Sequence, residues 1–91
     1  MVTSLILLNI ERGKINNVAE QLTDTSGISE VYSVSGNYDL IAIVRLKTND
    51  ELANLVTTKL SQIEAITKTE TMLAFKTYSK HDLETMFNVG M

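Results

Sequence analysis

The segment Ser35-Gly36-Asn37-Tyr38-Asp39 contains the residues whose types and spacing best suit a small-molecule site. A glycine leaves the neighbouring backbone N–H groups open to a carboxylate, and the carboxylate of Asp39 can pair with an ammonium group. A free amino acid carries both of these groups, a carboxylate and an ammonium group. The alternative is a plain hairpin turn followed by a polar residue, and the sequence leaves both interpretations open.

A β-hairpin is predicted around this segment. Apolar arms over residues 28–35 and 40–46 flank the Gly-Asn pair, and glycine accepts the positive φ of a type II′ turn. The second arm is apolar on both faces, with Leu40, Ala42, Val44 and Leu46 on one and Ile41 and Ile43 on the other. Because helices can cover only one face in so short a chain, we expect a second copy to cover the other.

The remaining elements give the order β-α-β-β-α-β. Residues 3–10 and 66–77 are predicted strands, and an amphipathic helix follows from Ile15, Val18, Ala19 and Leu22. A second helix begins at the capping box formed by Thr48 and Glu51. The predicted fold is α+β, the ferredoxin-like split βαβ: an antiparallel four-stranded sheet with both helices on one face, dimerising through the other.

Two segments are predicted: a domain over residues 1–78 and a helical tail over residues 79–91. Ser79 is a candidate N-cap of the tail, and its apolar stripe consists of Leu83, Met86 and Phe87. The stripe packs either on its own subunit or on a neighbour, and the sequence does not decide between them.

Composition excludes several classes of protein. The 91 residues form one domain with a thin core, and the absence of cysteine leaves no disulfide or thiolate metal site, so oligomerisation is the expected source of further stability. The net charge is −3 and the eight Lys and Arg residues are scattered, which argues against direct nucleic-acid binding. No apolar run approaches the roughly 20 residues of a membrane span. We expect a cytoplasmic protein without a metal or a cofactor.

Signals of catalysis are missing. The sequence contains no nucleophile elbow, no phosphate-binding loop and no dinucleotide fingerprint, and its one histidine, His81, lies in a polar tail segment. We therefore do not expect an enzyme. The alternative is an enzyme of the dimeric ferredoxin-like barrel class, such as a small monooxygenase or isomerase, which shares the predicted topology.

Three stretches carry a resemblance to a known family: ERGKINNVAEQL, GISEVYSVSGNYDLIAIVRL and TKTETMLAF. Over residues 3–77 the chain resembles the effector-binding, or RAM, domain of the Lrp/AsnC transcription regulators. It departs from that family at Arg12, where proline is common. It also lacks the N-terminal helix-turn-helix, so a stand-alone RAM protein is expected.

The resemblance implies dimers that close into a ring, with amino-acid effectors held between dimers. Residues 35–39 match the effector loop of the family, with Asp39 as the ammonium partner, and Thr71, Met72 and Leu73 match its pocket lining. For these last three, ordinary sheet packing is the alternative. The implied role is amino-acid sensing and assembly, which modulates transcription or amino-acid metabolism through partners such as full-length Lrp/AsnC regulators. A pure assembly partner that binds nothing small is the alternative.

Overall fold

The structure is a computed structural model that describes residues 1–80. Its elements are β1 (Val2–Ile10), α1 (Ile15–Thr23), β2 (Ile28–Ser33), β3 (Leu40–Leu46), α2 (Asn49–Asn54) and β4 (Ile66–Leu73). The helix that starts as α2 continues through a π-helical turn (Leu55–Lys59) and a 3-10 turn (Leu60–Gln62). The apolar stripe predicted for the tail, Leu83, Met86 and Phe87, lies outside the described residues.

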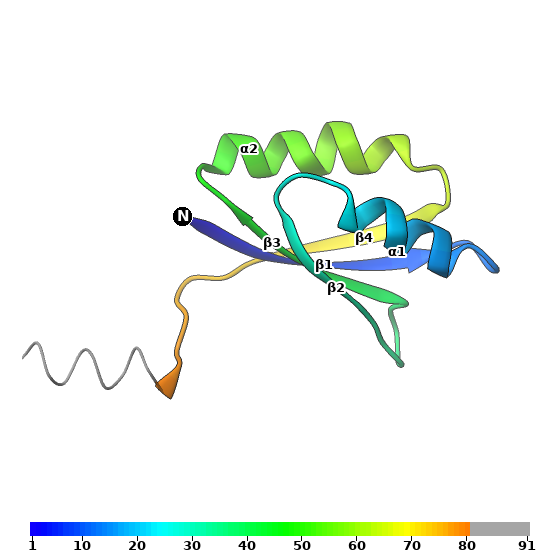
Figure 1. Cartoon of the computed structure of the whole chain (residues 1–91), viewed down its shortest axis with the longest axis horizontal. Helices are drawn as coiled ribbons and strands as arrows, with labels where there is room; N and C mark the ends of the chain where they lie inside the picture. Colours follow the sequence, from blue (N-terminus) through cyan, green and yellow to red (C-terminus); the bar gives the residue numbers. More distant parts are fainter. Residues whose placement is uncertain (81–91) are drawn as a thin grey trace, which may run out of the picture.

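The four strands form one antiparallel sheet in the order β2-β3-β1-β4. Both helices lie on the same side of this sheet (Figure 1). The ferredoxin-like prediction is therefore confirmed. β1 and β3 are the two central strands, so one face of each lies under the helices and the other forms the middle of the helix-free side of the sheet.

The core lies between the sheet and the helices. Alternate residues of β1 and β3 meet the apolar stripes of the helices there, and the buried side chains are Ile6, Leu8, Ile10, Leu40, Ala42, Val44, Val18, Leu22, Leu55 and Leu60. Ser4 is also fully buried, and its hydroxyl donates a 2.8 Å hydrogen bond to the carbonyl of Met72. That bond satisfies the one fully buried polar side chain among residues 1–80.

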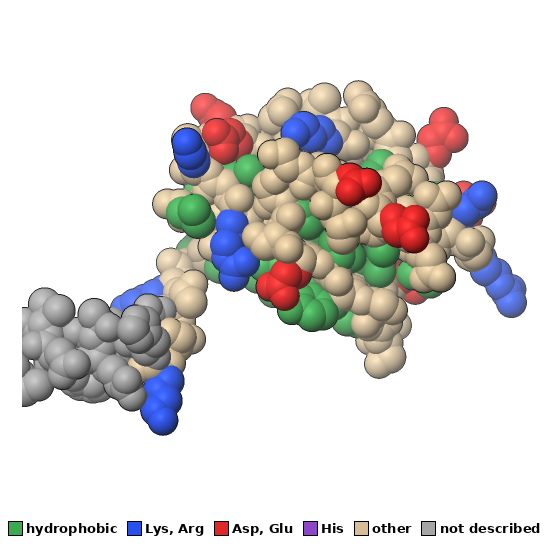
Figure 2. Space-filling model, viewed as in Figure 1, with side chains coloured by type: hydrophobic (Ala, Val, Ile, Leu, Met, Phe, Trp, Pro, Cys, Tyr) green, Lys and Arg blue, Asp and Glu red, His purple; other side chains and the backbone are tan. Residues whose placement is uncertain are grey.

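The other sheet face carries no helix, and we call it the open face. Its centre is formed by two cross-strand pairs, Leu5 with Ile43 and Leu7 with Ile41, all half-buried. Met72 lies beside Leu5 on the neighbouring strand β4 and is 45% exposed. Figure 2 shows hydrophobic side chains at the surface on this helix-free side of the sheet.

The capping box at the start of α2 takes a modified form. The Thr48 hydroxyl accepts a hydrogen bond from the Glu51 N–H at 3.1 Å, as predicted. The Glu51 carboxylate returns to the backbone N–H of Lys47, one residue before the cap, also at 3.1 Å. The two acidic residues Asp50 and Glu51 in the first turn suit the positive end of the helix dipole.

The last strand is shorter than predicted. We expected it over residues 66–77, but β4 ends at Leu73, and beyond it one more backbone bond joins the Ala74 N–H to the Thr3 carbonyl at 2.9 Å. The partner strand limits its length: β1 begins at Val2, which the register places opposite Phe75, so residues beyond 75 have no strand left to pair with. The apolar and aromatic residues that follow, Phe75 and Tyr78, are 98% and 69% exposed.

Candidate functional site

The predicted site residues 35–39 lie in the loop of residues 34–39, which joins β2 to β3. It projects from the sheet on the side away from the helices (Figure 1). Gly36 has φ +107, the left-handed region that favours glycine, and no atom lies within 4 Å of the position that a Cβ would take there. Ser35, Gly36 and Asn37 are exposed, so the tip of the loop is accessible to solvent.

Asp39 is tied to the central strand. Its N–H donates to the Leu8 carbonyl at 2.9 Å, and its carbonyl accepts from the Val34 N–H at 3.0 Å, which closes the loop. Its carboxylate oxygen Oδ2 accepts from the Ile10 N–H at 2.8 Å. The side chain therefore replaces a backbone acceptor at the end of β1, with Oδ2 as the accepting oxygen.

Tyr38 connects the loop to the far edge strand. Its hydroxyl donates to the Glu70 carboxylate oxygen Oε2 at 2.5 Å, and since β1 lies between β3 and β4, this contact crosses the width of β1. The Lys68 ammonium nitrogen lies 6.0 Å from the centre of the Tyr38 ring. The hydrogen bond to Glu70, followed by desolvation and by the negative charge of Glu70, raises the pKa of Tyr38 above its ordinary value.

Glu70 and Lys68 were missed in the sequence. In the β1–β4 register Glu70 pairs with Leu7 and Lys68 pairs with Asn9, so both belong to the open-face side of β4. The signal that pointed to them is the alternation of charge in the segment Lys68-Thr69-Glu70, which places two charged side chains on one face. Their proximity to Tyr38, 32 positions away from Glu70, depends on the strand register.

The three predicted lining residues on β4 do not gather at the loop within one subunit. Met72 pairs with Leu5, four residues before Asn9 along β1, so it lies about 13 Å from the loop end of the strand. Thr71 pairs with Ile6 and Leu73 with Ser4, which places these two on the helix side of the sheet. All three are exposed, Leu73 at 47%.

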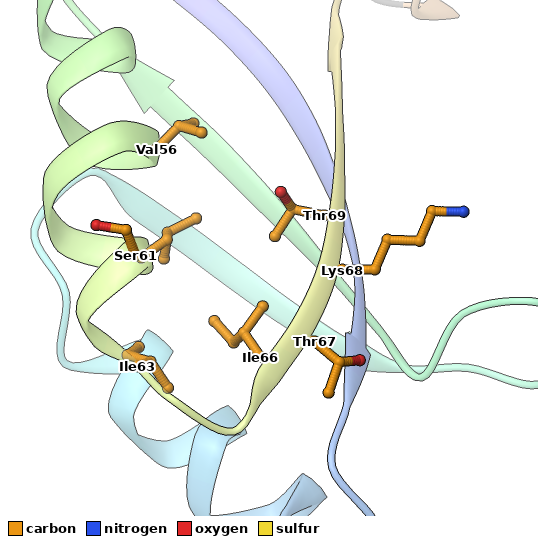
Figure 3. Close-up of a pocket in the computed structure, with 8 residues that line it drawn as sticks. Val56, Ser61, Ile63, Ile66, Thr67, Lys68 and Thr69 are labelled. Carbon is orange, nitrogen blue, oxygen red and sulfur yellow. The ribbon is translucent and has the colours of Figure 1, made fainter.

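A second concave region lies between the end of the α2 helix and β4. It has a volume of about 190 Å³ and is lined by Val56, Leu60, Ser61, Ile63, Ile66, Thr67, Lys68 and Thr69. Figure 3 shows Val56, Ile66 and Thr69 turned toward the gap, whereas Lys68 points away on the opposite side of the strand. None of the ligand-binding residues predicted from the sequence lines this cleft.

Two further findings concern residues 1–80 alone. No group of three or more His, Cys, Asp and Glu side chains in that range is placed to hold a metal ion. None of the helices within it has the length and the apolar character that crossing a membrane requires.

Comparison with known proteins identifies the family. The model of the Lrp/AsnC ligand binding domain matches residues 3–83. FL11, an HTH-type transcriptional regulator of Pyrococcus furiosus, is 32% identical over 79 residues, which cover 87% of this chain and 52% of FL11. The chain thus spans about half the length of the curated relatives it matches.

Solved structures share the fold. The crystal structure of TTHA0845 from Thermus thermophilus is 38% identical, with a TM-score of 0.82 over 88% of this chain and 100% of that one. NMB0573 from Neisseria meningitidis, a transcriptional regulator solved as a complex with L-Met, has a TM-score of 0.78 at 10% identity, over 86% of this chain and 52% of that one. At that identity the second likeness shows the fold alone. On the family match and the FL11 likeness, the chain belongs to the Lrp/AsnC ligand-binding domain family.

Proposed function

We propose that the chain senses a free amino acid and controls the assembly of an Lrp/AsnC-type regulator. The observation that carries this proposal is the 34–39 loop. Its exposed tip has open backbone around Gly36, and its base holds the Asp39 carboxylate in a fixed position through Ile10. A carboxylate at the tip and an ammonium group at the base are the two ends of an amino acid.

The comparisons support the ligand class indirectly. The family is described by its ligand-binding role, and the Neisseria regulator of the same fold was solved with an amino acid. Neither observation was made on this chain. The screen described below is designed to identify the amino acid that it binds.

Dimerisation through the open face completes the proposal. Leu5, Leu7, Ile41 and Ile43 form an apolar strip with no cover within residues 1–80. A dimer that covers it would need a standard interface of roughly 1,600 Å² in total. Several dimers would then close into a ring.

The ring gives Thr71, Met72 and Leu73 a role. Because the loop of their own subunit is about 13 Å from Met72 along the sheet, these exposed residues would line the effector site only from another dimer. In this arrangement the amino acid lies between dimers and its binding changes their association.

The chain would act through partners, without catalysis and without its own contact to DNA. Its net charge of −3 disfavours the phosphate contacts on which DNA binding depends. Full-length Lrp/AsnC regulators, which have the same kind of domain, are the partners that fit, because the same interfaces would join the two proteins.

Two measurements on the full chain test the proposal. A thermal-shift screen with the common amino acids, each at about 5 mM, should raise the unfolding temperature for one or a few of them. Light scattering with and without those amino acids should give a mass above that of a monomer and a ligand-dependent change in it. Absence of any shift would remove the sensing role and leave the assembly role alone.

A further inference from the structure

We propose that Lys68 binds the carboxylate end of the amino acid while Asp39 binds its ammonium end. The inference rests on the proposed function and names a second charged contact of the same site. It comes from the place of Lys68 in the sheet, which the sequence did not reveal.

Lys68 and Asp39 lie on either side of the same end of β1. Lys68 pairs with Asn9 from β4, and the Asp39 carboxylate bonds to the N–H of Ile10, the next residue, from the β3 side. The backbones of the two flanking strands are about 10 Å apart, since each strand spacing is close to 5 Å. One carboxylate and one flexible four-carbon ammonium side chain thus belong to the two strands that flank the same end of β1.

Tyr38 directs Lys68 toward the loop. The Lys68 nitrogen lies 6.0 Å from the centre of the Tyr38 ring, and Tyr38 directly precedes Asp39 in the loop base. The face of the ring attracts a cation, so it favours lysine conformers that stay beside the loop. Lys68 points away from the cleft under α2, which leaves its ammonium group on the side where the loop projects (Figures 1 and 3).

Glu70 is a positioning residue in this arrangement. Its carboxylate receives the Tyr38 hydroxyl at 2.5 Å and so fixes the ring beside Lys68. Glu70 acts through Tyr38 and has no contact of its own with the amino acid. The open backbone at Gly36 would add neutral N–H donors to the carboxylate contact that Lys68 begins.

This pairing predicts which ligands bind. An α-amino acid satisfies both charges at once, whereas its α-amide keeps the ammonium group and loses the carboxylate. Charge-assisted contacts of this kind correspond to roughly ten- to a hundredfold in affinity. The wild-type chain should therefore prefer the amino acid over its α-amide by about that factor.

The test compares Lys68→Met, Lys68→Arg and Lys59→Met in the full chain by calorimetry. The titrants are the amino acid that gives the largest thermal shift and its α-amide. Lys68→Met should weaken binding of the amino acid about tenfold or more and leave the α-amide unchanged, while Lys68→Arg keeps most of the affinity. Lys59, in the π-helical turn on the opposite side of the molecule, is the control for net charge and should have no effect.

Three outcomes would overturn the assignment. If Lys68→Met weakens the amino acid and the α-amide equally, the lysine acts only on the structure of the loop. If Asp39→Asn abolishes binding and Lys68→Met does not, the proposed function stands and the role of Lys68 is wrong. If the wild type binds no amino acid in the screen, the proposed function fails, and the assignment of Lys68 fails with it.

Discussion

The carboxylate of Asp39 accepts a hydrogen bond from the backbone N–H of Ile10 at 2.8 Å. Ile10 is the last residue of β1, and without this bond its buried N–H would need another acceptor at the sheet end. Asp39 therefore has two roles: it stabilises the end of β1 through Ile10, and it is a candidate contact for the ligand. A substitution at this position has to separate the two.

Asp39→Asn and Asp39→Ala should separate them. The asparagine carbonyl can still accept from Ile10, so Asp39→Asn should keep nearly all of the stability, whereas Asp39→Ala should lose about 1 to 2 kcal/mol with the bond. Both variants remove the charge and should weaken amino-acid binding by roughly ten- to a hundredfold. Urea denaturation measures the first effect and calorimetry the second. Equal binding by wild type and Asp39→Asn would show that the ammonium is bound elsewhere.

The Tyr38 hydroxyl should titrate at a higher pH than a free tyrosine, since its bond to Glu70 favours the neutral phenol. A folded-state pKa above the unfolded value of about 10 means that this contribution to stability is complete below pH 10. It is lost as the pH rises from there through the folded-state pKa. Phenolate absorbance in a Tyr32→Phe/Tyr78→Phe background would follow Tyr38 alone.

Glu70→Gln supplies the comparison for that titration. The amide still accepts a hydrogen bond but removes the negative charge, so the pKa of Tyr38 should fall toward its ordinary value. An unchanged pKa in Glu70→Gln would mean that Tyr38 and Glu70 are not in contact in solution.

The fold was predictable because its signals are local. The short apolar runs in residues 3–10 and 40–46 and the helical spacing of Ile15, Val18 and Leu22 each depend on neighbours in the chain. The positive φ of Gly36 followed in the same way from the needs of a turn. The early end of β4 did not, because a strand extends only where a neighbouring strand pairs with it, and β4 pairs with β1 only as far as Ser4 and Leu73.

Of the contacts around the candidate site, the sequence predicted only the position of the loop between two strands. The contact of Tyr38 with Glu70 and the place of Lys68 beside it arise from the β1–β4 pairing, whose register shifts between Asn9 and Ile10. Alternation alone places Lys68 and Glu70 on one face of β4, but the residues that lie beside them on the other strands depend on the register, which no local pattern gives. The Thr-rich start of β4 was interpreted only as a strand for that reason.

Gly27 and Gly36 offer a matched pair of alanine substitutions. Both have positive φ, at +95 and +107, so both variants strain the backbone. At Gly27 the new Cβ would also lie 2.4 Å from Cδ2 of Leu46, whereas nothing lies within 4 Å at Gly36. Gly27→Ala should thus cost about 1 to 3 kcal/mol more than Gly36→Ala if Leu46 cannot move aside. Denaturation of both variants gives the difference, and equal stabilities would show that Leu46 repacks freely.

The open face should be an interface between copies of the chain. Ile41 and Ile43 are half-buried there, while Val44, their neighbour in β3, is fully buried under the helices. The Ile43→Lys variant should therefore stay folded but form a smaller assembly than the wild type, because a charge at the centre of an apolar interface opposes association more than folding. Val44→Lys should instead unfold the chain, since its charge would enter the core.

Light scattering for mass and circular dichroism for folding distinguish these outcomes at micromolar concentration. A wild type that is monomeric, with normal cooperative unfolding, would contradict the interface. So would an Ile43→Lys variant that keeps the wild-type mass. If Ile43→Lys unfolds as completely as Val44→Lys does, the open face is needed for folding itself, and dimerisation and folding of this thin sheet are one process.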